Sequence, residues 1–162
     1  MAAALRSRGG IEIHKQAIAH APAPLGSVVR TWAGKLPARY VYHAVVIDYD
    51  VSKGTSASDV VAAVRSSLAC ARQDGIRSIA MPLFGAGVGG LSVRASLETI
   101  LDTIEESADA FDTDLTVEVV VRDEDEFSGA LKVFSEFKDR RSRATEEDEL
   151  AEEFIKQLLG KS

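Results

Sequence analysis

The chain has 162 residues, of which 46% are apolar and 27% are charged, a balance typical of one soluble globular domain. Its formal net charge of -6 argues against general binding of nucleic acid, and no apolar run approaches the length of a membrane span. Cys70 is the only cysteine, which excludes a disulfide framework and favours a reducing compartment such as the cytoplasm.

Helical and extended patterns alternate along the chain, which predicts an α/β layer fold. The first 21 residues read as helix with a break near Gly9 and Gly10, and the prolines that follow end this segment. In chain order, the patterns then predict strands at 27–32 and 39–49, a polar loop at 48–58, a helix from 58 to 75, a strand at 78–84, a helix from 92, a strand at 115–122 and a further helix.

Each predicted helix carries apolar residues at helical spacing. Ser92 is the expected N-cap of the helix that follows it, and Gly75 is the expected stop of the helix before. The three stripes are Val60, Val61, Val64 and Leu68; Val93, Leu97, Ile100, Leu101 and Ile104; and Phe127, Leu131 and Phe134.

A glycine-rich turn lies between the predicted strand at 78–84 and the helix from Ser92, with four glycines among residues 85–90. Such a turn lets the backbone approach a ligand and aligns several N–H groups, and the following helix adds the positive end of its dipole. This geometry suits a phosphate or pyrophosphate, although a purely structural tight turn explains the same glycines. The turn lacks the Gly-Lys-Ser/Thr of a Walker loop, and nothing around it supports a dinucleotide fingerprint.

Several segments together resemble the macro domain, an α/β module that binds ADP-ribose. The likeness spans most of residues 9–137 and is carried by four runs, at 26–31, 34–45, 75–82 and 85–90. The resemblance implies a three-layer α/β/α fold with a mixed sheet and a ligand in a crevice at the strand ends.

The resemblance also implies a ligand site around the glycine-rich turn. Its backbone is expected to hold the pyrophosphate and the distal ribose, although Ala86 and Leu91 replace a hydroxyl residue and an aromatic residue that the family often has there. Arg122 is expected to stack on the adenine, or else to pair with Asp123 or Glu124. The expected ligand-binding residues are Gly85, Ala86, Gly87, Val88, Gly89, Gly90, Leu91 and Arg122.

The start of the sequence departs from the family pattern. No counterpart is found for the first two strands, the Asp that reads adenine or the Asn of the hydrolase branches. The second of these strands lies inside the family's sheet, so its loss leaves two edges with unpaired backbone groups. Direct pairing of residues 40–47 with 78–84, a strand from another chain, or residues upstream of Met1 could each satisfy these edges.

The tail differs in character from the rest of the chain. We expect a macro-like domain at 1–138, then a charged linker at 139–143 and an amphipathic helix, with Thr145 and Asp148 in the places of a capping box. Leu150, Phe154, Leu158 and Leu159 form its apolar stripe. This helix either docks on its own domain or joins two chains, so homo-oligomers are expected through it or through the open sheet edges.

No metal or cofactor site is expected. His14 and His20 are six residues apart, which does not suit two ligands on one helical face, and His43 reads as a hydrogen-bonded core residue. Asp48 and Asp50 read as solvated, although they could hold a cation, and no catalytic residue is recognisable. The resemblance therefore implies a module that binds ADP-ribose or a related nucleotide diphosphate, with an ADP-ribosyl or O-acetyl-ADP-ribose hydrolase and a ligand-free assembly module as alternatives.

Overall fold

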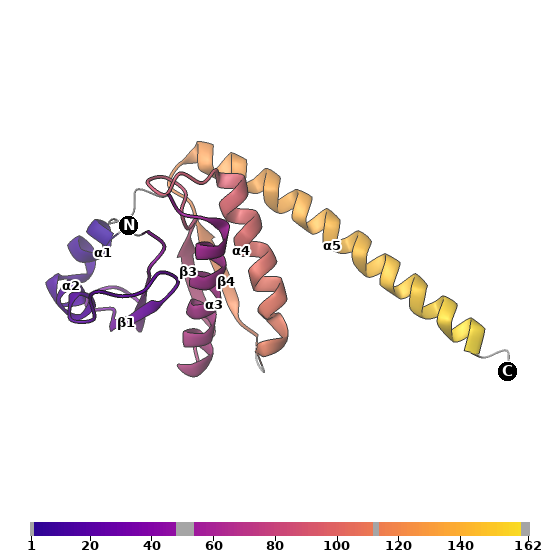
Figure 1. Ribbon diagram of the computed structural model, residues 1–162, viewed down its shortest axis with the longest axis horizontal. Helices are drawn as coiled ribbons and strands as arrows, with labels where there is room; N and C mark the ends of the chain where they lie inside the picture. Colours follow the sequence, from indigo (N-terminus) through magenta and orange to yellow (C-terminus); the bar gives the residue numbers. More distant parts are fainter. Residues whose placement is uncertain (1, 48–53, 112–113, 160–162) are drawn as a thin grey trace.

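The computed structural model describes residues 2–47, 54–111 and 114–159 (Figure 1). Helices and strands alternate as the sequence predicts, although each strand is shorter than its predicted range. The elements are α1 (Ala2–Gly9), α2 (Ile11–Ile18), β1 (Val28–Trp32), β2 (Tyr40–Ala44), α3 (Ala57–Gln73), β3 (Ser78–Pro82), α4 (Val93–Ser107), the 3-10 turn η1 (Ala108–Ala110), β4 (Thr116–Val120) and α5 (Glu124–Leu159).

The N-terminal part combines α1 and α2 with an antiparallel pair of strands. The predicted helix break is confirmed at Gly10, whose φ of 100° favours glycine. β1 and β2 pair in antiparallel register, with Arg30 opposite Tyr42. α2 packs on β1 and buries Ile13.

The C-terminal part contains the main apolar core. β3 and β4 pair in parallel, with Ser78 opposite Thr116, and α4 lies between them in the chain. Val117 and Val119 pack against the core, whereas Glu118 and Val120 on the other face are exposed. Residues of the predicted α3 and α4 stripes line this core together with residues from β3, the turn after it and α5: Val60, Val64, Leu68, Met81, Leu83, Leu97, Ile100, Leu101, Val133 and Phe137.

In the described part of the chain, two separate two-stranded sheets take the place of one continuous sheet. Together they contain antiparallel and parallel pairs, the two orientations of the predicted mixed sheet, but among the described residues no ladder joins β2 to β3. α3 contacts both β1 and β2 and supplies core residues beside β3, so it connects the two halves. The expected direct pairing of residues 40–47 with 78–84 is therefore not formed.

α5 corrects two expectations. Residues 139–143 are not a linker, because the helix passes through them without a break, and Thr145 donates its hydroxyl to the carbonyl of Arg141 instead of capping a new helix. A boundary at 138/139 therefore does not separate two elements. Phe127, Leu131 and Phe134, which mark this helix in the sequence, are exposed, because α4 packs against the neighbouring face that carries Val133 and Phe137.

α5 extends well beyond the rest of the molecule (Figure 1). Its first half packs on α4, with ion pairs from Arg140 to Asp102 and from Arg141 to Glu105. Its second half projects away from the body. Within the described part of the chain, no helix is long and apolar enough to span a membrane.

Candidate functional site

The glycine-rich turn follows β3 and leads into α4, as predicted. Ser92 caps α4 by accepting a hydrogen bond from the amide of Ala95, which confirms the predicted N-cap. One turn later the buried Ser96 donates its hydroxyl to the carbonyl of Phe84 at 2.7 Å. These two serines hold the N-terminus of α4 against the base of the turn.

Glycine is required in the turn for two different reasons. Gly85, Gly87 and Gly90 adopt φ values of 75°, 103° and 81°, in the left-handed region that side chains disfavour. Gly89 lies outside that region, but a Cβ atom there would sit 2.7 Å from the carbonyl oxygen of Gly85 and 2.4 Å from Oγ1 of Thr55. The turn is thus both tightly curved and closely packed.

Three consecutive backbone amides of the turn have no hydrogen-bond acceptor in the described part of the chain. Two amides are used inside the turn, since Leu91 donates to Gly85 and Gly90 donates to Gly87, both at 3.0 Å. Among the described residues, nothing accepts a hydrogen bond from the amides of Gly87, Val88 and Gly89. Three successive N–H groups that no described residue accepts from, close to a helix N-terminus, form an arrangement that favours an anion.

Thr55 connects the glycine-rich turn to the N-terminal part of the protein through hydrogen bonds. The sequence analysis did not identify this residue, which falls in the predicted polar loop. Its amide donates to the carbonyl of Gly89 at 2.9 Å, and its hydroxyl donates to the carbonyl of Val46 at 2.8 Å. Thr55 is only 6% exposed, so both bonds are shielded from water. The next residue, Ser56, caps α3 in a capping box with Asp59, and this Ser-x-x-Asp spacing was the available signal.

Arg122 lies beside the turn because β3 and β4 are parallel and their carboxyl ends meet at one edge. Its Nη1 is 4.0 Å from the position that a Cβ at Gly87 would occupy. Its ion-pair partner is Glu126, and not Asp123 or Glu124 as expected. Glu126 is buried and accepts hydrogen bonds from the amide and Nε of Arg122, both at 2.8 Å.

This pair fixes the charge state at the edge of the site. The hydrogen bonds from Arg122 lower the pKa of Glu126, so its carboxylate stays ionised and is a poor proton acceptor. The guanidinium of Arg122 remains largely exposed, and the carboxylate of Glu126 holds it in position. Among the described residues, the site thus places the oriented guanidinium of Arg122, paired with Glu126, beside the turn that carries the amides of Gly87, Val88 and Gly89.

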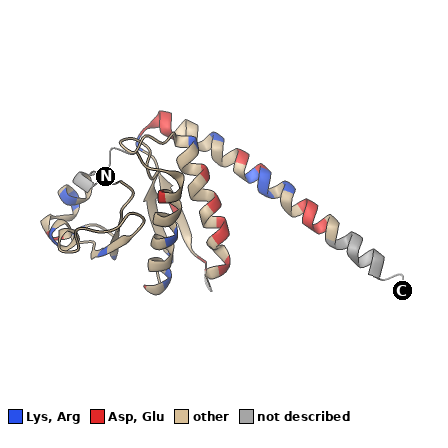
Figure 2. Ribbon diagram, viewed as in Figure 1, with Lys and Arg blue, Asp and Glu red and all other residues tan. Residues whose placement is uncertain are grey.

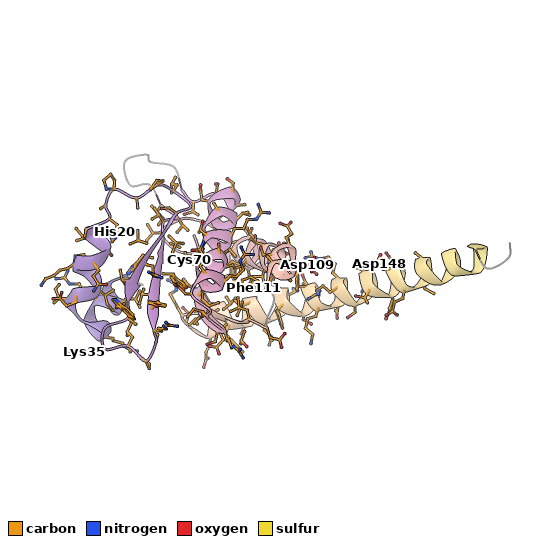
Figure 3. All side chains as sticks on the ribbon, turned by 90° about the horizontal axis from the view of Figure 1, so that it is seen from below. His20, Lys35, Cys70, Asp109, Phe111 and Asp148 are labelled. Atoms are coloured by element: carbon orange, nitrogen blue, oxygen red, sulfur yellow. The ribbon has the colours of Figure 1, made fainter. Side chains whose placement is uncertain are left out.

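The remaining candidates lie away from this edge. His43 shares a hydrogen bond of 3.0 Å with Thr31, and burial lowers its pKa, as expected for a core histidine. Cys70 lies on α3 within the body of the protein (Figure 3), where burial raises the pKa of its thiol. Asp48 and Asp50 fall outside the described residues, and the described residues contain no cluster of metal-ligating side chains.

Comparison with known proteins identifies the family. A family model of the macro domain matches residues 1–100. The chain belongs to the macro domain family. Its predicted α/β architecture is confirmed by two similar solved macrodomains: one from Oceanobacillus iheyensis with ADP (TM-score 0.71, 21% identity, covering 85% of this chain and 76% of the other) and one from Trypanosoma brucei in complex with ADP-ribose (TM-score 0.69, 23% identity, 80% and 54%).

The sequence relatives of this macro domain are longer proteins. An uncharacterized protein of Aeropyrum pernix is 42% identical over 92 residues, which cover 57% of this chain and 48% of the relative. An uncharacterized protein of Mycobacterium tuberculosis is 41% identical over 90 residues, which cover 56% and 24%. The chain thus spans about half of the first relative and about a quarter of the second.

Proposed function

We propose that this macro domain binds ADP-ribose or a related nucleoside diphosphate, with the diphosphate on the amides of Gly87, Val88 and Gly89. The observation that carries the proposal is that these three successive amides have no acceptor among the described residues. A diphosphate supplies several oxygens within a short distance, which matches a short row of donors. The ADP and ADP-ribose bound by the two structural relatives are ligands of this class.

Two neighbouring features support an anionic ligand despite the net charge of -6. The N-terminus of α4 begins directly after the turn and adds a partial positive charge. The guanidinium of Arg122 lies beside Gly87 with its charge paired to Glu126, and its exposed side can contact a phosphate or stack on a base. The turn therefore offers backbone donors, a helix N-terminus and a guanidinium to an anion within an acidic protein.

Binding without turnover is the form of the proposal that the site supports best. Hydrolysis of an ADP-ribosyl or acetyl ester needs a group that orients and deprotonates water. Of the described groups at this edge, Glu126 is held ionised by Arg122, and the hydroxyl of Thr55 donates to a backbone carbonyl. We expect little release in an assay with ADP-ribosylated protein or O-acetyl-ADP-ribose.

Val88 offers a sharp test, because its side chain is 84% exposed and its φ is negative. Val88→Glu places a negative charge beside the phosphates without straining the backbone, whereas Val88→Gln adds the same bulk without charge. Titration calorimetry with ADP-ribose should show affinity reduced roughly tenfold or more for the glutamate variant and little changed for the glutamine variant. Gly87→Glu, which adds charge and backbone strain together, should abolish binding.

Circular dichroism of each variant separates loss of binding from loss of fold. Adenosine, which lacks phosphates, serves as the control ligand and should bind far more weakly than ADP-ribose. If the folded wild-type protein gives no heat and no thermal shift with ADP-ribose, the proposed function is wrong. Equal affinity of the two Val88 variants would instead remove the turn from the site.

A further inference from the structure

Three aromatic rings form a row on one face of the β1–β2 hairpin. Antiparallel pairing sets Trp32 opposite Tyr40 and Arg30 opposite Tyr42. Because alternate residues of a strand share a face, these four side chains lie together. The ring centroids of Trp32 and Tyr40 are 5.0 Å apart, and those of Tyr40 and Tyr42 are 6.3 Å apart. We call the rings of Trp32, Tyr40 and Tyr42 the aromatic row.

The Trp32 end of the aromatic row is open to solvent. Trp32 is 61% exposed, although tryptophan side chains are highly buried on average. At the other end, Tyr42 is partly buried and donates its hydroxyl to Asp74 at 2.7 Å. The backbone amide of Trp32 donates to Oε1 of Gln16 at 3.1 Å, which holds the strand below the indole. The row is therefore anchored at its buried end and presents the indole of Trp32 to a ligand.

Arginine side chains border the aromatic row. The guanidinium carbons of Arg30 and Arg39 lie 5.1 Å and 5.0 Å from the centroid of the Tyr40 ring. The charge of Arg30 is already balanced, because its guanidinium is ion-paired with Asp74. Arg39 is exposed and forms no ion pair with a described residue. Arg39 thus places a positive charge next to the row without a carboxylate beside it.

The N-terminal part around the row is basic, although the whole chain is acidic. Residues 2–47 contain a single acidic side chain, Glu12, and its carboxylate is paired with Lys15. The acidic side chains gather on α4 and α5, away from the hairpin (Figure 2). The end of α1 contacts the hairpin loop, since the amide of Lys35 donates to the carbonyl of Gly9 at 3.0 Å. These two segments carry exposed cations that form no ion pair with a described residue: Arg6, Arg8, Lys35 and Arg39.

We propose that this surface binds single-stranded nucleic acid, with a base stacked on Trp32 and phosphates beside Arg39, Lys35 and the end of α1. Proteins that bind single strands without sequence preference combine aromatic rings with a basic surface, and both are present here. An acidic peptide would use the cations but offers no flat base to the indole. The carboxylates of α4 and α5 oppose this contact only weakly, because salt screens charges that lie more than about 10 Å away.

The proposed surface is separate from the glycine-rich turn. β2 starts at Tyr40 beside the hairpin loop and leads to Val46, whose carbonyl accepts a hydrogen bond from Thr55 next to the turn. Six residues of extended chain span about 20 Å. A diphosphate on the turn and a base on Trp32 therefore do not compete. The two ligands can be tested independently of each other.

Trp32 is the only tryptophan of the chain, so its fluorescence reports directly on the aromatic row. In full-length protein, single-stranded oligothymidylate of about 12 nucleotides should quench this fluorescence. The affinity should fall steeply as the salt concentration rises, because phosphate contacts release counterions. Saturating ADP-ribose should leave the oligonucleotide bound, and a duplex of the same length should bind more weakly because its bases are already stacked.

Fluorescence anisotropy of a labelled oligothymidylate measures the variants that lack the indole. Trp32→Ala should weaken binding roughly tenfold or more, whereas Trp32→Phe keeps a stacking ring and should retain most of the affinity. Arg39→Glu should also weaken binding roughly tenfold. Arg143→Glu is the matched control, because it makes the same change of charge at an exposed position on α5, and it should bind nearly as the wild type does.

Circular dichroism shows whether each variant keeps its fold, so that unfolding is not read as loss of binding. The proposal is overturned if oligothymidylate neither quenches Trp32 nor binds at low salt, if Trp32→Ala binds as the wild type does, or if Arg39→Glu and Arg143→Glu have equal effects. Displacement by ADP-ribose would place the oligonucleotide on the turn and would also overturn it. Polyglutamate that competes as well as unlabelled oligothymidylate would show that the surface recognises charge alone, which contradicts stacking on Trp32.

Discussion

Replacing Gly89 by alanine should disrupt the turn by steric overlap and not by backbone strain. The added Cβ would lie 2.7 Å from the carbonyl oxygen of Gly85, 2.8 Å from its Cα and 2.4 Å from Oγ1 of Thr55. Neither neighbour moves freely, because Gly85 accepts a hydrogen bond from Leu91 and Thr55 is held by Val46. Overpacking of this kind costs about 1–3 kcal/mol, and relieving it shifts the amides that we assign to the diphosphate.

Gly90→Ala is the matched control for this prediction. Gly90 has a φ of 81° with nothing within 4 Å of the position that a Cβ would occupy, so alanine there causes backbone strain of about 1–2 kcal/mol without a clash. Urea denaturation should show a similar loss of stability for both variants, whereas calorimetry with ADP-ribose should show a much larger loss of affinity for Gly89→Ala. Unchanged affinity in Gly89→Ala would refute the role given to the packed turn.

Two further variants test how the fold supports the site. Ser96→Ala leaves the carbonyl of Phe84 without its buried donor and should lower the free energy of unfolding by about 1–3 kcal/mol in urea; a change near zero would show that another donor replaces the hydroxyl. Burial and the hydrogen bond to Asp74 raise the pKa of Tyr42 above its usual value, so the folded state retains the phenol proton longer than the unfolded chain does. The resulting stabilisation is complete below about pH 10 and is lost as the pH rises further, so the stability of the wild type should fall more steeply in alkali than that of Tyr42→Phe, and parallel curves would contradict this.

Local features of this protein could be predicted from the sequence because neighbouring residues determine them. The helix break at Gly10, the N-cap at Ser92 and the apolar stripe of α4 depend on backbone conformation, side-chain capping and helical spacing. The position of the glycine-rich turn between a strand and a helix follows from the same short-range patterns. These patterns were sufficient to predict the α/β class, and the resemblance of four sequence runs suggested the family that the comparisons confirm.

Long-range packing decided the rest. Thr55 contacts Gly89 across the fold, and Arg122 lies beside the turn because β3 and β4 are parallel. The choice of Glu126 as the partner of Arg122 depends on the first turn of α5. Phe127, Leu131 and Phe134 fit a core stripe as well as Val133 and Phe137 do, and the place where α4 packs determines which face is buried. A helical sequence pattern indicates that one face of the helix is apolar. Only the positions of the other elements determine whether that face packs against the core, a ligand or a second chain.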